Sequence, residues 1–290
     1  MQSRNILNVA LLSAVVTLAV AAWFVYKDKT AVSYLSSLPA SQITSIIIPR
    51  EHGDIVLSKA GKTWRMEKPY AMAAHDFRVQ SLLGLLQTPV SQSYAATELD
   101  LAEFGLMPAR ATIRYNNHEI KFGKSSPVND KRYLLSEGRI YLLNDTLYPL
   151  VSAEAASLVS LSLLEPDASI EKISLPDLIL QKDMDNLWHD QHGKTIAADS
   201  AQQLLDNWHH ASAYGVHAYL ARPNAKTVMI ELGNTTALHF LVAQENNALI
   251  IGRPDTGIEY HFNAQYAEEI MKLPQKYPAE AGHARDSVKN

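Results

Sequence analysis

The chain has 290 residues, of which 47% are hydrophobic and 19% are charged, and its formal net charge is -4. This composition is typical of a folded chain and excludes intrinsic disorder. The near-balanced charge disfavours a nucleic-acid partner, because a protein needs a basic surface to offset phosphates. The absence of cysteine excludes a disulfide scaffold, a thiolate nucleophile, an iron–sulfur cluster and a lipoprotein anchor.

An uncharged run of 21 residues begins at Ile6. As a helix, this run would be roughly 30 Å long, which matches the hydrocarbon core of a bilayer. Trp23 lies near its end, where aromatic rings favour the headgroup layer. We therefore predict a transmembrane helix over residues 6–26, after a cytoplasmic stub over residues 1–5 and before a linker over residues 27–40. A cleaved signal peptide is the alternative.

An N-terminal anchor of this kind usually leaves only its stub in the cytoplasm. The sequence therefore predicts a single-pass protein of the bacterial inner membrane, with its C-terminal domain in the periplasm. The anchor also carries small residues at helical spacing, which would let another membrane helix approach closely. These candidate packing residues are Ser13, Thr17 and Ala21. The alternative is that this stripe faces lipid.

The rest of the chain contains one pattern twice. Each copy begins with short strands separated by polar turns and reaches a strand with a tryptophan, Trp64 in the first copy and Trp188 in the second. A helix follows in each copy, with Asp76 or Asp199 at its start. Further hairpin strands and a closing helix complete each copy.

Hairpin connections between most of these strands indicate antiparallel sheets rather than a doubly wound parallel fold. The predicted fold class is α+β, with an N-terminal transmembrane helix followed by two tandem, diverged α+β units with mainly antiparallel sheets. We predict the first repeat over residues 41–165, the second over residues 166–274, and a flexible C-terminal tail over residues 275–290.

The first copy also carries a series of short motifs. In chain order they are Trp64-Arg-Met-Glu-Lys-Pro69, Ala74-x-Asp76, Phe104-Gly105-Leu106-x-Pro108, Phe122-Gly123-Lys124 and Tyr133. This order resembles the bacterial family catalogued as domain of unknown function 4340, with the second copy as a degenerate second unit. The resemblance implies a single-pass protein with an exported domain, and some family members are encoded beside gliding-type ABC transporter components. It implies no catalytic residue.

Motifs for hydrolysis and for phosphate binding do not occur in the sequence. Eleven histidines invite a metal hypothesis, but their spacing matches no standard zinc site. The densest group is His189, His192, His209, His210 and His217. We expect no catalytic residue, no metal site and no cofactor, and the sequence leaves open whether these histidines converge.

Aromatic and apolar side chains are the candidate interaction residues, because they gain most from burial against a partner. The candidates are Phe104, Leu106 and Pro108 in a loop of the first copy, and Trp208, Tyr214 and Tyr219 near the end of the second copy's helix. The alternative for the loop is ordinary packing over the sheet. The alternative for Trp208 is a place in the core, because it lies at helical spacing from Leu204 and Leu205.

Three functions from different classes remain open. The favoured one is a non-catalytic, membrane-anchored periplasmic scaffold or accessory subunit that binds a membrane protein complex, for which the resemblance suggests an ABC transporter. The second is a periplasmic binding module for a small molecule, polysaccharide or lipid, in a groove between the repeats. The third is a histidine-based metal enzyme. The favoured function is not enzymatic and needs a membrane-protein partner. The sequence leaves open whether the protein forms a homo-oligomer.

Overall fold

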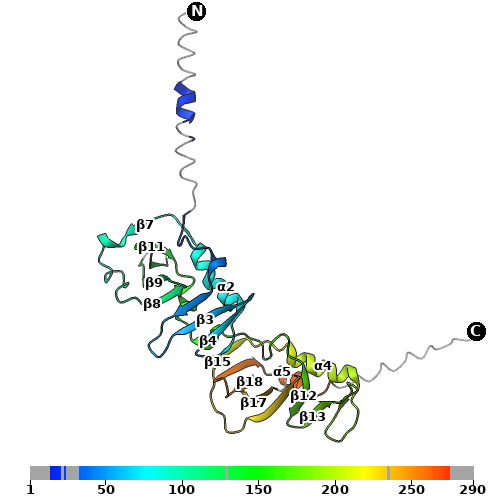
Figure 1. Ribbon diagram of the computed structural model, residues 1–290. Coiled ribbons are helices and arrows are strands. Elements are labelled where there is room, and N and C mark those ends of the chain that lie inside the picture. Colours follow the sequence, from blue (N-terminus) through cyan, green and yellow to red (C-terminus); the bar gives the residue numbers. More distant parts are fainter. Residues whose placement is uncertain (1–13, 21–22, 24–32, 128–129, 234–235, 275–290) are drawn as a thin grey trace, which may run out of the picture. The chain divides into compact units, whose positions relative to one another are not determined.

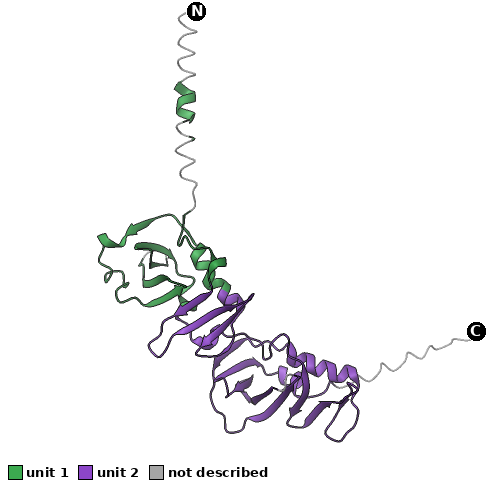
Figure 2. Ribbon diagram, in the orientation of Figure 1, with its two compact units in different colours: residues 1–43, 80–151 green, residues 44–79, 152–290 purple. Residues whose placement is uncertain are grey.

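The computed structural model describes residues 14–20, 23, 33–127, 130–233 and 236–274 (Figure 1). The described chain divides into two compact units (Figure 2). Unit 1 combines residues 1–43 with residues 80–151, and unit 2 combines residues 44–79 with residues 152–290.

Unit 1 is built mainly from short strands. They are β1 (Ser33–Tyr34), β6 (Pro89–Val90), β7 (Ser93–Ala95), β8 (Ala111–Tyr115), β9 (His118–Ser125), β10 (Lys131–Ser136) and β11 (Arg139–Asn144). Helix α2 (Asp76–Gly84) ends in this unit, and α3 (Tyr148–Ser152) closes it.

Unit 2 contains the strands that remain. They are β2 (Ser45–Ile48), β3 (Ile55–Ala60), β4 (Thr63–Lys68), β5 (Met72–Ala73), β12 (Ile170–Leu175), β13 (Leu178–Lys182), β14 (Trp188–His189), β15 (Gly215–Ala218), β16 (Lys226–Leu232), β17 (Ala237–Glu245), β18 (Ala248–Arg253) and β19 (Ile258–Asn263). Its helices are α4 (Ala198–His209) and α5 (Tyr266–Met271).

The strand order follows the same scheme twice. The second copy forms an eight-stranded sheet in the order β14-β13-β12-β16-β17-β18-β19-β15. In the first copy, the run β4-β3-β2 of unit 2 corresponds to β14-β13-β12, and the run β8-β9-β10-β11-β7 of unit 1 corresponds to β16-β17-β18-β19-β15. The described pairings within these runs are all antiparallel.

Alternation of apolar and polar side chains explains why these segments form strands. In β4, the apolar residues Trp64 and Met66 are buried, while the polar residues between and beside them are at least partly exposed. Turn chemistry fixes the hairpins, as between β8 and β9, where Asn116 has a φ of 52°. Asparagine tolerates this left-handed conformation, so the short turn forms with little strain.

Helix α4 lies on the second sheet through one apolar stripe. Ala201, Leu204, Leu205 and Trp208 are all buried, and they recur at the spacing of one helix face. Ala197, the residue before the helix, provides no side-chain cap for its first amides. Helix α5 packs beside it, because the Trp208 indole N–H donates to the carbonyl of Ile270 at 2.7 Å.

The predicted α+β fold class is wrong, because the described chain is mostly β-sheet. Its helices are short: α2 has 9 residues, α3 has 5, α4 has 12 and α5 has 6. They cover or close antiparallel sheets and do not form a helical layer of comparable size. The reason is that strands, most of them joined by short turns, occupy far more of residues 45–263 than helices do.

The transmembrane helix in the predicted fold class is also not borne out. Of residues 6–26, the structure describes residues 14–20 as helical and residue 23, and the others lie outside the described residues. Among the described residues, no helix is both long and apolar enough to cross a membrane.

Candidate functional site

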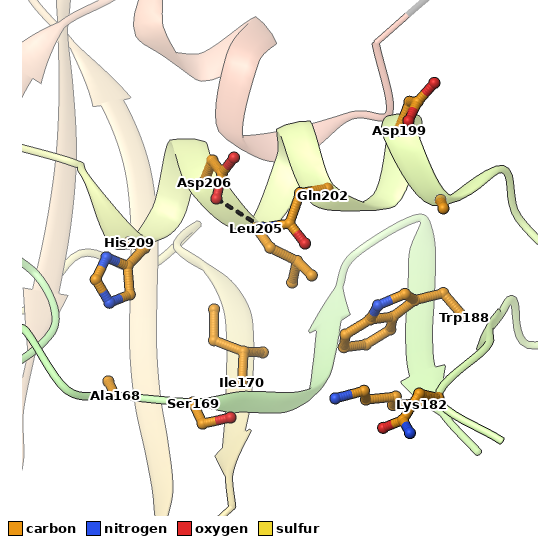
Figure 3. Close-up of a pocket in the computed structure, with 12 residues that line it drawn as sticks. Ala168, Ser169, Ile170, Lys182, Trp188, Asp199, Gln202, Leu205, Asp206 and His209 are labelled. Atoms are coloured by element: carbon orange, nitrogen blue, oxygen red, sulfur yellow. Dashed lines mark hydrogen bonds between the residues drawn. The ribbon is translucent and has the colours of Figure 1, made fainter. Parts of the chain in front are cut away.

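A cavity of about 520 Å³ lies in unit 2 between α4 and the strands β12 to β14 (Figure 3). Its apolar floor is formed by Ile170, Trp188 and Leu205, with Leu205 pointing from the helix toward the strands. The polar side chains around the floor are Ser169, Lys182, Asn186, Asp199, Gln202, Asp206 and His209.

Among the polar residues around the floor, some form a hydrogen bond or an ion pair with another side chain. The Gln202 amide donates to the Asp206 carboxylate at 2.8 Å, and the Lys182 ammonium lies 4.0 Å from the Glu171 carboxylate. The floor residues Trp188 and Leu205 are both buried. A lining of this kind can hold a ligand or a protein side chain that has an apolar body and a polar end.

An open sheet edge lies next to the cavity. The Ile196 amide donates to the Trp188 carbonyl at 2.8 Å, and Thr195 forms an antiparallel bridge with His189. Thr195 and Ala197 therefore direct backbone polar groups away from β14, by the alternation of an antiparallel ladder. Both residues are exposed, and within the described ranges no hydrogen bond involves the Thr195 carbonyl or the Ala197 amide.

The first copy has the same local geometry. There the Ala74 amide donates to the Trp64 carbonyl at 2.9 Å, as the Ile196 amide does to Trp188. Because Ala74 corresponds to Ile196, the residues on either side of it, Ala73 and His75, correspond to the two open positions of the second copy.

The corresponding edge of the first copy is covered by a further segment of the chain. The His75 amide donates to the Leu158 carbonyl at 2.7 Å, and the Ser160 amide donates to the Ala73 carbonyl at 2.9 Å. Val159 lies between these two bonds and is fully buried. The chain thus fills this edge in its first copy, whereas no described residue pairs with the outer side of the equivalent edge in its second copy.

A second cavity in unit 2, of about 440 Å³, has a more apolar lining. Trp64, Met72, Leu163 and Leu238 contribute to it, together with Tyr260 of β19. The Tyr260 hydroxyl is buried and has no hydrogen-bond partner in the described part of the chain. Burial raises the pKa of this hydroxyl to about 12, so Tyr260 is a neutral donor at physiological pH.

A buried charge cluster joins β19 to the segment after β15. The Glu259 side chain is 2% exposed and accepts hydrogen bonds from the Arg222 guanidinium at 2.6 and 3.1 Å, from the Leu220 amide at 2.9 Å, and from the His261 ring at 2.8 Å. Burial by itself would raise the pKa of the Glu259 carboxyl, but these donors lower it to about 2. The cluster fixes this segment to the sheet.

The predicted interaction loop of the first copy packs closely on the sheet. Phe104 is half-buried, with its ring centroid 4.9 Å from that of Tyr133, and Leu106 is buried. Gly123 permits this approach, because a Cβ at that position would collide with the Phe104 carbonyl. Pro108 is exposed at the end of the loop.

The structure separates the three aromatic candidates of the second copy. Trp208 is fully buried in the core, with its ring centroid 5.6 Å from that of Phe240. Tyr214 precedes β15 and is 62% exposed, whereas Tyr219 follows β15 and packs against Gly252. Of the predicted membrane-helix packing residues, Thr17 lies in the short described helix, and Ser13 and Ala21 lie outside the described residues.

The histidines singled out in the sequence are spread over several elements. His189 is hydrogen-bonded to Asp183 at 2.7 Å, the His209 and His210 rings contact each other, and His217 lies beside a ring of β19. In the part of the chain that is described, no three histidine, aspartate or glutamate side chains are placed to hold a metal ion.

Sequence reasoning missed the residues at the centre of this site. Thr195 and Ala197 follow a polar turn and carry no motif, and the only local sign of an edge is that Trp188 repeats the position of Trp64. Glu259 does carry a signal, since it is a charged residue inside the apolar strand Ile258–Asn263.

The fold and the site define an antiparallel β-sheet protein with two related repeats, and in the second repeat an edge that no described residue covers lies beside a cavity. The family model described as Domain of unknown function (DUF4340) matches residues 64–247, and the chain belongs to this family. The family resemblance expected from the motifs is therefore confirmed. No curated protein and no solved structure matches the chain.

Proposed function

We propose that the protein is a non-catalytic accessory subunit that binds a partner in a membrane protein complex. The contact is made by the open face, which we define as the edge Thr195–Ala197 together with the cavity beside α4. One observation carries this proposal: the equivalent edge of the first copy is covered by residues 158–160, and the open face has no such cover in the described chain.

Backbone amides and carbonyls at a sheet edge form a template for pairing with another chain. A cavity next to such an edge adds selectivity, because it accepts side chains of one shape and polarity. The open face combines both features within unit 2. The family resemblance favours an ABC transporter as the complex and the periplasm as the location, and both belong to this proposal.

In-cell photocrosslinking tests the proposal. A photoreactive amino acid at Gln202, on the rim of the cavity, is expected to capture one membrane protein in stoichiometric yield. The matched control places the same amino acid at Asn246, in the exposed turn between β17 and β18, where no capture is expected. Recovery of the protein alone, or only of its own oligomer, would rule out the accessory-subunit function as stated.

A second candidate function is the binding of a small molecule in the second cavity. The unpartnered Tyr260 hydroxyl favours it, because a buried donor without an acceptor costs about 1–3 kcal/mol and a ligand acceptor would remove that cost. The expected ligand is neutral, with an apolar body and one hydrogen-bond acceptor.

Two matched aromatic probes test this candidate by calorimetric titration. 1-Acetylnaphthalene, which has a carbonyl acceptor, is expected to bind about tenfold more tightly than 1-ethylnaphthalene. The Tyr260→Phe variant should lose this difference and keep its fold, because the hydroxyl makes no bond in the described chain. Equal affinities of the two probes for the unmodified protein would exclude a role for the hydroxyl.

A further inference from the structure

We infer that the partner binds the open face with an extended peptide segment, which adds to Thr195–Ala197 as one more antiparallel strand. The inference rests on the proposed function and specifies how the partner is recognised. The partner segment carries an aliphatic side chain opposite Ile196 and a free backbone amide at the following residue.

The first argument is the backbone geometry of the first copy. In that copy the added strand accepts a hydrogen bond from His75 and donates one to Ala73. The same two groups in the second copy are the Ala197 amide and the Thr195 carbonyl, which face away from β14. An extended segment in the same register can therefore form both bonds without any change in the edge.

The second argument concerns the side chains of the pairing. Val159 pairs with Ala74 across the first-copy edge, and both side chains are buried, because directly opposed residues lie on the same face of a sheet. Ile196 occupies the position of Ala74 and is only half-buried. A partner residue opposite Ile196 would cover it, which selects an aliphatic side chain.

The cavity continues this surface. Its lining includes Trp188 of β14, whose carbonyl accepts from the edge residue Ile196, and Ala198, the residue directly after the edge. A segment that continues along the edge past Ala197 therefore reaches the cavity at Ala198. A neighbouring side chain with an apolar body can enter it and contact the floor at Leu205 (Figure 3).

Residues 158–160 pair with the first-copy edge and cannot also cover the edge of the second copy. Leu158 and Val159 are fully buried at the first-copy edge, so residues 158–160 are already engaged there. The open edge is also short, since α4 begins at Ala198. A short edge gives few backbone bonds, and recognition then depends on the side chains opposite Ile196 and in the cavity.

A synthetic peptide with the sequence of residues 155–163 is the probe, because this segment fills the equivalent edge in the first copy. We expect it to bind the full-length chain and to slow hydrogen exchange at the Ala197 amide at least tenfold at saturation. The same peptide with an N-methyl group at the residue equivalent to Ser160 cannot donate to the Thr195 carbonyl, and we expect it to bind at least tenfold more weakly.

A proline at position 197 tests the edge from the other side. Ala197 has a φ of -58°, close to that of proline, and its amide is not bonded in the described chain. Ala197→Pro should therefore fold normally and bind the peptide at least tenfold more weakly. Ala197→Ser is the matched control: it keeps the amide, binds as the unmodified protein does, and unfolds at a higher temperature because serine caps α4.

Several results would overturn the inference. One is equally tight peptide binding by the proline and serine variants. Another is slow exchange at Ala197 without peptide that becomes fast when residues 275–290 are removed, which would make the chain's own tail the occupant. Hydrogen exchange at the Ala197 amide that becomes slower as the protein concentration rises would instead assign the edge to a second copy of the chain.

The test also distinguishes the inference from the proposed function. If the photoreactive Gln202 variant captures a membrane protein in the presence of Ala197→Pro as efficiently as without it, strand addition is wrong and the accessory-subunit function stands. If the photoreactive Gln202 variant with an unmodified edge captures no membrane protein, the proposed function fails, whether or not the peptide binds.

Discussion

Replacement of Trp208 by alanine is expected to lower the free energy of unfolding by about 3–5 kcal/mol. The indole is fully buried beneath α4 and contacts the ring of Phe240. Its N–H also donates to the Ile270 carbonyl, so the substitution would leave both a void and a buried acceptor without its donor.

Urea denaturation of the full-length chain measures this loss. Tyr214→Ala is the control, because Tyr214 is an exposed aromatic residue of the same region and its truncation should change the free energy by less than about 0.5 kcal/mol. Trp208→Phe should fall between the two, since it keeps most of the packing and loses the hydrogen bond. A Trp208→Ala protein as stable as the Tyr214→Ala protein would contradict the assignment of this indole to the core.

Features that depend on residues close together in the chain can be predicted from the sequence. The spacing of Ala201, Leu204, Leu205 and Trp208 predicts one buried helix face, and all four side chains are buried in α4. The turn residues Asn116-Asn117 predict the hairpin that joins β8 to β9. Short-range periodicity and turn chemistry are sufficient for such elements.

Features that depend on contacts between distant parts of the chain cannot be predicted in this way. Residues 158–160 have no local property that assigns them to the edge next to His75, because such pairing depends on where the sheet brings its edges. Arg222 and Glu259 are likewise 37 positions apart, and only the sheet places β15 next to β19. The open face is defined by this non-local pattern, and the sequence therefore did not reveal it.

The fold class shows that individual helices can be predicted correctly while the proportion of helix to strand in the whole chain is predicted wrongly. The apolar stripe of α4 does form a buried helix face, but α2 and α4 are short, and the helices contribute far fewer residues to the described chain than the strands do. Composition at the N-terminus predicted a long helix over residues 6–26, whereas the helix that is described there covers residues 14–20.

The Glu259 cluster predicts how stability depends on pH. The carboxyl has a pKa of about 2 in the folded chain and an ordinary value of 4.5 when exposed. Because the folded value is the lower one, the charged carboxylate stabilises the fold above about pH 4.5, and this stabilisation is lost as the pH falls toward 2. A difference of this size corresponds to about 3 kcal/mol at neutral pH.

Glu259→Gln is therefore expected to lower the free energy of unfolding by about 3 kcal/mol at pH 7 and by much less at pH 2. The amide keeps the size of the side chain but leaves the Arg222 guanidinium without its buried counter-charge, which is the costly part of the change. Urea denaturation of both proteins at several pH values between 2 and 7 measures the effect. Glu245→Gln removes the exposed partner of the same guanidinium and should cost less than about 1 kcal/mol. A loss for Glu259→Gln that stays constant across this range would show that the carboxylate's charge does not hold the segment to the sheet.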